Sequence, residues 1–194
     1  MSPVAWESDP RAGEILLALA RAAIAEHFGR VEKPDDSASW LAEPGAVFVT
    51  LSQGGRLRGC IGSLEAHRSL ASDVAHNARA AAFSDPRFPP LTADELPRTR
   101  IEVSVLSAPE PLPASTETEL LARLRPGVDG LILSWGGHRG TFLPQVWEQL
   151  PEPRDFWTHL KRKAGLPLSF WSPDALIQRY TVTAWTEPDN TTAT

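Results

Sequence analysis

Apolar residues recur along the chain at two different periods, and the period predicts which segments are helices and which are strands. Helical spacing occurs in residues 11–28 and again in residues 69–83. Shorter helices are predicted at residues 116–124 and 154–164. Residues 100–106 instead alternate apolar and polar side chains, which is typical of a half-buried strand.

Two pairs of adjacent glycines separate runs of strand-forming residues, and each set predicts an antiparallel hairpin. The glycine pairs are residues 54–55 and 136–137, and the flanking runs are residues 46–51 with 57–62 and residues 128–135 with 139–143. One further strand is predicted at residues 177–185. Hairpins and helices follow each other without a repeating strand–helix–strand order. The pattern therefore favours an α+β fold, an antiparallel sheet with flanking helices.

Composition and charge narrow the class of protein. With 42% hydrophobic and 22% charged residues among 194, the chain has the balance of a soluble globular protein. Its net charge of −5 argues against an extended nucleic-acid surface. The single cysteine allows no internal disulfide and fits a reducing compartment. Residues 15–24 are too short to span a bilayer, and the first ten residues lack a signal-peptide pattern, so we expect a cytoplasmic protein without a membrane partner.

The only cysteine lies in the second strand of the first predicted hairpin. Side chains two residues apart in a strand lie about 6.5 Å apart on one face, so Arg58, Cys60 and Gly62 share a face. A guanidinium that near would stabilise the thiolate and lower the pKa of the thiol, as a nucleophilic cysteine requires. Gly59 and Gly62 leave backbone that a ligand or another segment can approach closely. The alternative is that Cys60 is a small apolar side chain that fills the core or lines a pocket.

A cysteine nucleophile also needs a base, usually a histidine. The chain has five histidines, and none has a diagnostic spacing to Cys60. We expect His159 to face inward because it lies beside an apolar stripe of its helix, which makes it the candidate base. A surface or core position without a catalytic role is the alternative for each histidine. No two histidines lie four residues apart and no Cys-x-x-Cys pattern occurs, so we predict no metal site and no cofactor.

Three further polar residues are candidate site residues. Asn77 falls on the apolar stripe of the second long helix, so its amide needs hydrogen-bond partners, and the backbone of the loop after the helix would supply them without a functional role. Gln145 could point into a cleft or cap a strand end. Arg87 lies in a proline-rich loop, where it could bind an anion or form a salt bridge with Asp85 or Glu95.

Several segments, in this order, resemble the AMMECR-domain family, which appears in prokaryotes as protein A of the AmmeMemoRadiSam system. The segments are residues 57–62 (LRGCIG), 77–83, 85–92 (DPRFPPLT), 95–96, 101–107 (IEVSVLS), 142–146 (FLPQV) and 163–166 (KAGL). The resemblance extends over residues 12–185. We therefore expect a single domain there, between loose termini at residues 1–11 and 187–194.

This resemblance implies a larger lobe built from both chain ends, a smaller lobe, and a cleft between them. The candidate cleft residues that it implies are Arg58, Cys60, Gly62, Asn77, Arg87 and Gln145. It supplies no assigned reaction, and it implies association with a Memo-like protein and a radical SAM protein. The sequence departs from the family pattern at residues 136–141, which are rich in glycine and arginine, and at Trp171 and Trp185.

Three functional hypotheses follow. The chain is an accessory or small-ligand-binding component that acts beside partner proteins, with the strand of Arg58 and Cys60 lining a cleft. Alternatively, it is a cysteine-dependent enzyme in which Arg58 activates Cys60 and His159 serves as the base. The third hypothesis is a non-catalytic adaptor whose exposed tryptophans, with Trp157 and Trp171 as the examples to test, form a protein interface.

Overall fold

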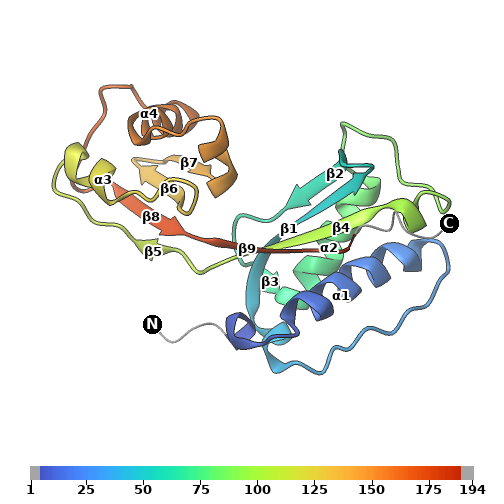
Figure 1. The fold of residues 1–194 in the computed structure, drawn as a ribbon. Coiled ribbons are helices and arrows are strands. Elements are labelled where there is room, and N and C mark those ends of the chain that lie inside the picture. The colour runs from blue at the N-terminus through green and yellow to red at the C-terminus, as the bar shows by residue number, and fades with distance from the viewer. Residues whose placement is uncertain (1–4, 189–194) are drawn as a thin grey trace. The chain divides into compact units, whose positions relative to one another are not determined.

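The computed structural model describes residues 5–188 and divides them into two compact units (Figure 1). The first unit contains the described residues up to Leu106 together with those from Thr183 onward, and the second contains the residues between them. Each unit combines helices with an antiparallel sheet, so the fold is α+β, as the sequence predicted.

The first unit is a sheet with two helices packed on one face (Figure 1). Its strands occur in the order β2–β1–β4–β9, and the short β3 pairs with the start of β1. The strands are β1 Pro44–Gln53, β2 Arg56–Gly62, β3 Arg68–Ser69, β4 Arg100–Leu106 and β9 Val182–Thr186. The helices are α1 Ala12–His27 and α2 Leu70–Phe83, with 3-10 turns at Ala5–Ser8, Ser39–Ala42 and Leu96–Arg98.

Small side chains and one glycine let α2 lie close to the sheet. The hydroxyl of Ser69 caps the helix by accepting a hydrogen bond from the N–H of Ser72. Ala78 and Ala81 are buried on the face that packs against the sheet. A Cβ at Gly59 of β2 would lie 2.2 Å from the carbonyl oxygen of Ala81. The absence of a side chain at Gly59 therefore sets the distance between helix and strand.

The second unit is a four-stranded sheet in the order β5–β8–β6–β7 with its own core. Trp147 stacks on Phe156 with ring centroids 3.8 Å apart, and both side chains are buried. The strands are β5 Glu110–Pro111, β6 Gly130–Trp135, β7 His138–Phe142 and β8 Leu176–Tyr180. The helices are α3 Glu117–Arg123 and α4 Pro153–Lys163, with a 3-10 turn at Pro144–Glu148.

The prediction of one strand at residues 177–185 is wrong, because the segment forms two strands in two sheets. β8 pairs with β6 in the second unit, whereas β9 pairs with β4 in the first. Between them, Thr181 bonds through its backbone to Ser107, accepting from its N–H and donating to its hydroxyl, both at 2.9 Å. Apolar alternation continues through this point, so the local pattern carries no sign of the change of sheet.

The described parts of both terminal segments are packed rather than loose as expected. Trp6 is buried and meets Trp185 of β9 edge to face, with ring centroids 5.8 Å apart. The Glu187 carboxylate accepts hydrogen bonds from Arg21 at 2.5 and 2.6 Å and from the N–H of Ile101 at 2.9 Å. The expectation for residues 1–4 and 189–194 lies outside the described residues. Within residues 5–188, no helix has the length and apolar character needed to cross a bilayer.

We predict that Gly59→Ala destabilises the first unit by about 1–3 kcal/mol, because the added methyl meets helix backbone that cannot rotate away. The measurement is urea unfolding of the full chain. Gly45→Ala is the matched control, since its Cβ would meet the side chain of Leu70 rather than helix backbone and should cost less. Equal losses in the two variants would contradict the packing argument.

Candidate functional site

Cys60 lies in β2, at the edge of the first unit's sheet, with its side chain on the face away from the helices. The strand register pairs it with Thr50 of β1, and Thr50 Oγ1 donates a hydrogen bond to the sulfur at 3.3 Å. Neighbouring Gly59 points toward α2, as the alternation of a strand requires. Cys60 is half-buried. The thiol therefore belongs to a face of the sheet that the helices of its own unit leave uncovered.

Asp85 and Arg87 hold the backbone of Cys60 along the outer edge of the sheet. Asp85 Oδ2 accepts from the N–H of Cys60 at 2.9 Å, and Arg87 Nη2 donates to the carbonyl oxygen of Cys60 at 3.2 Å. The two side chains also bind each other, with Arg87 Nη2 2.7 Å from Asp85 Oδ2 and Arg87 Nε 2.9 Å from Oδ1. Of the two alternatives for Arg87, the structure shows the salt bridge with Asp85.

The environment of Asp85 keeps its carboxyl group ionised. Its side chain is buried, which by itself would favour the neutral acid. The hydrogen bonds from the Arg87 side chain outweigh that effect, and the backbone N–H groups of Cys60 and Arg87 add to them. Together they hold the pKa of Asp85 well below its usual range. The contact with Cys60 is therefore one between a backbone N–H and a full carboxylate charge.

Arg58 is bound to Glu95 rather than to the thiol. Its Nε and Nη2 each lie 3.0 Å from one carboxylate oxygen of Glu95, and its Nη1 donates to the carbonyl of Pro89 at 2.9 Å. Hydrogen bonds from Arg58, followed by one from the N–H of Thr92, lower the pKa of Glu95 to about 2 against the opposing effect of burial. The sequence argument for an activated Cys60 took Arg58 as unpaired, whereas a bidentate carboxylate compensates its charge.

Gly62 makes room for an aromatic ring on the same face as Cys60. The register pairs Gly62 with Phe48 of β1, and a Cβ at Gly62 would lie 2.2 Å from the Phe48 ring. At Gly59 the close neighbour is the backbone of α2. At both glycines the space that a side chain would fill is occupied by another segment of the chain. Of the two alternatives that the sequence left open, a ligand or another segment, the structure shows the second.

Asn77 lies in a buried polar network beside β1. Its Nδ2 is 3.2 Å from the carbonyl oxygen of Val47 and 3.0 Å from both Ser63 Oγ and Asp73 Oδ2. Buried Asp73 also accepts from the N–H of Val47 at 2.9 Å and from Arg68 Nη1 at 2.6 Å. The expectation that Asn77 binds the loop after α2 is wrong, because acceptors on β1 and one turn earlier on α2 lie within reach of its amide.

His159 and Gln145 belong to the second unit, whereas the residues gathered around Cys60 belong to the first. His159 is half-buried in α4, and its Nδ1 lies 2.9 Å from the carbonyl oxygen of Asp155. Gln145 is exposed in the 3-10 turn that follows β7. Within residues 5–188, no three histidine, cysteine or acidic side chains form a group that could hold a metal ion.

Sequence reasoning named Asp85 and Glu95 only as possible partners of Arg87, and it did not name Asp73. Asp85 had a local signal, since it stands two residues before Arg87 in a loop stiffened by proline. The contacts of Glu95 with Arg58 and of Asp73 with Val47 had no local signal, because these partners are 37 and 26 residues away along the chain. Only the folded sheet brings these groups within hydrogen-bonding distance.

We predict that Glu95→Gln lowers the free energy of unfolding by about 1–2 kcal/mol at pH 7, because a neutral amide replaces the charged partner of Arg58. The pKa of Glu95 is lower in the folded than in the unfolded chain. Its contribution is therefore complete above the unfolded value, about 4.3, and declines as the pH falls toward 2.

Urea unfolding of wild type and Glu95→Gln at pH 7 and pH 3 measures this difference, which should shrink at pH 3. Glu32→Gln, at an exposed glutamate, is the control and should change little at either pH. A difference between wild type and Glu95→Gln that is the same at both pH values would show that the ion pair with Arg58 adds no stability.

Comparison with known proteins identifies relatives across nearly the whole chain. A protein of Methanothermobacter thermautotrophicus is 39% identical over 173 residues, which cover 87% of this chain and 90% of that protein. Protein TK0174 of Thermococcus kodakarensis is 36% identical over 189 residues and 90% of each chain. The crystal structure of the uncharacterised protein PH0010 of Pyrococcus horikoshii is 35% identical, covers 91% of this chain and 92% of that chain, and superposes with a TM-score of 0.75.

The family assignment follows from the extent of these matches. The sequence pattern of the AMMECR1 family matches residues 17–185, a range that contains the whole cluster around Cys60 and both sheets except the last residue of β9. The chain therefore belongs to the AMMECR1 family.

Proposed function

We propose that the protein is a non-enzymatic accessory component that binds a small ligand through the helix-free face of its first sheet. One observation carries the proposal: the charged groups beside Cys60 are engaged in structural contacts, while its sulfur remains on the open face. Arg58 is paired with Glu95, and Arg87 with Asp85. Such an arrangement fixes the position of a thiol without supplying the positive charge that would activate it.

The lining of this face favours a ligand with both a polar and an apolar part. Thr50 and Cys60 present a hydroxyl and a thiol that already bond to each other at 3.3 Å. The ring of Phe48 lies two register pairs further along the same strands, at the next pair on this face, against Gly62. A ligand that hydrogen-bonds to the hydroxyl and packs on the ring would use both features.

The enzyme hypothesis has less support, because two of the first unit's three histidines have other contacts and the third, His76, lines a groove along α2. His27 stacks on Phe83, with ring centroids 4.0 Å apart. His67 is exposed and lies 3.1 Å from Glu65. The sulfur of Cys60 accepts a hydrogen bond from the hydroxyl of Thr50, and a hydroxyl group is not a base at neutral pH.

The adaptor hypothesis assumed exposed tryptophans, and the side chains it named are covered. Trp157 is only 1% exposed, and Trp171 is partly buried against it. Trp6, Trp40 and Trp147 are buried as well. An interface built on several tryptophans is therefore not favoured.

The proposal includes partners that the family resemblance implies. We expect the ligand-binding face to act together with a Memo-like protein and a radical SAM protein inside the cell. Association with partner proteins does not by itself require this chain to catalyse a reaction. It is therefore compatible with a Cys60 thiol that only lines a binding site.

We predict that Cys60 reacts with iodoacetamide no faster than the thiol of glutathione between pH 6 and 7, because Arg58 is committed to Glu95. Mass spectrometry of the full chain, sampled over time, measures the rate. Arg58→Lys should leave that rate unchanged within about twofold. Fast alkylation at pH 6 that is lost in Arg58→Lys would instead establish the activated nucleophile.

We further predict that the full chain binds a purified Memo-like or radical SAM protein with measurable affinity in isothermal titration calorimetry. Thr50→Arg, which places a charged side chain on the helix-free face, should weaken that binding at least tenfold. Glu14→Arg, at an exposed position of α1, is the control and should bind as wild type does. Absence of binding to both proteins would contradict the partner proposal, and equal binding by Thr50→Arg would contradict the proposed face.

A further inference from the structure

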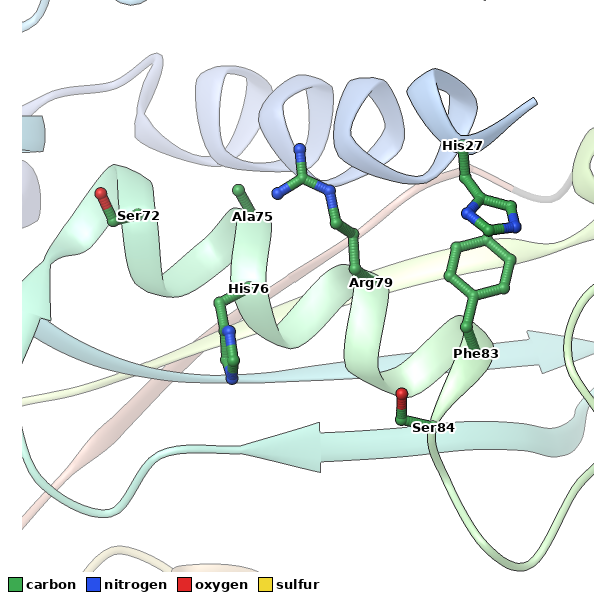
Figure 2. A pocket seen from close by; sticks show the side chains of 7 residues that line it. All are labelled: His27, Ser72, Ala75, His76, Arg79, Phe83 and Ser84. Atoms are coloured by element: carbon green, nitrogen blue, oxygen red, sulfur yellow. The ribbon is translucent and has the colours of Figure 1, made fainter. Parts of the chain in front are cut away.

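A groove of about 450 Å³ runs along the outer face of α2, on the helical side of the first unit (Figure 2). Ser72, Ala75, Arg79 and Phe83 of α2 follow each other at spacings of three or four residues and so line one side of the helix, and His76 is three residues from Arg79. The C-terminal end of α1 contributes one residue. The lining consists of His27, Ser72, Ala75, His76, Arg79, Phe83 and Ser84.

The polar lining of the groove is basic, although the chain as a whole carries a net charge of −5. Figure 2 shows Arg79 near the middle of the groove, reaching toward α1, and His76 pointing away from α1. Hydroxyl groups of Ser72 and Ser84 lie toward the two ends. No lining residue is acidic. This set of donors suits an anionic group, and Arg79 is the group best placed to hold one.

One end of the groove is aromatic. The exposed ring of His27 stacks on Phe83 with centroids 4.0 Å apart and an interplanar angle of 28° (Figure 2). The ring of Phe28 meets both edge to face, at 5.3 and 5.7 Å. This cluster fixes the position of the His27 ring, so a planar group can pack against it without first ordering it.

Glu26 is the acidic residue that would compete with an anion for Arg79. Its carboxylate lies 2.5 Å from Arg79 Nη2, with side chains 66% and 48% exposed. An ion pair so accessible to water contributes little stability, so a ligand can displace it at low cost. The guanidinium has five N–H donors, and one contact with Glu26 does not exhaust them.

We propose that this groove binds a small aromatic anion, with its phosphate or carboxylate on Arg79 and its ring against His27. This site is distinct from the face that carries Cys60. Its test is therefore independent of the test of the function proposed for that face. The ligand is identified by its chemistry alone, an acidic group joined to a planar ring.

The test is an NMR titration of the full chain with phenyl phosphate, inorganic phosphate and phenol, followed through backbone amide shifts. Phenyl phosphate should shift the amides of residues 72–84 and bind more tightly than either fragment. Arg79→Gln should raise its Kd at least tenfold, and Glu26→Gln should lower it about two- to fivefold by removing the competing carboxylate. Arg98→Gln, at an exposed arginine elsewhere in the unit, is the control and should leave the Kd unchanged.

His27→Gln tests the aromatic half of the proposal. It should reduce the affinity for phenyl phosphate to that for inorganic phosphate, and a thermal melt checks that the variant is folded. Shifts that map outside the groove, or a Kd that Arg79→Gln does not change, would overturn the proposal. Equal binding of phenyl phosphate and inorganic phosphate to the wild-type protein would overturn the aromatic half.

Discussion

The first unit depends on how the outward-facing backbone hydrogen-bonding groups of its edge strand β2 are satisfied. β2 lies at the end of its sheet, so every second residue points its N–H and C=O groups away from β1 and needs another partner. At Cys60 both groups are bound by side chains of a single loop, Asp85 and Arg87. Since these two side chains also bind each other, strand and loop are fixed together, and the open edge is closed to other strands.

The ion pair between Arg58 of β2 and Glu95 connects the strand to the chain that follows α2 a second time. The loop supplies Arg87 to the backbone of β2, and β2 supplies Arg58 to Glu95 and to the carbonyl of Pro89. Both of these arginines, which the fold brings beside the cysteine, are therefore used to build the site. Their charges are compensated by carboxylates whose pKa values are lowered by these contacts.

Because both arginines are bound by carboxylates, we favour a binding role for Cys60 over a catalytic one. The thiol of Cys60 stays on the helix-free face beside the hydroxyl of Thr50, and the neighbouring Arg58 and Arg87 are each paired with a carboxylate. A rigid surface of that kind suits recognition better than nucleophilic attack. On the helical side of the same unit, the groove around Arg79 offers a basic and aromatic lining of a different character. The first unit thus presents two chemically distinct surfaces, one on the helix-free face of its sheet and one along α2.

The sequence by itself determined the elements whose signals are local. The two long helices and both glycine-pair hairpins occur as predicted, because helix periodicity and the positive φ of Gly54 and Gly137 are set by neighbouring residues. Only the tertiary structure decided which strands share a sheet and which charges meet. The split of residues 177–185 between two sheets and the pairing of Arg58 with Glu95 depend on segments far apart in the chain. For the same reason, the sequence could place an arginine near Cys60 but could not show that a distant carboxylate had already bound it.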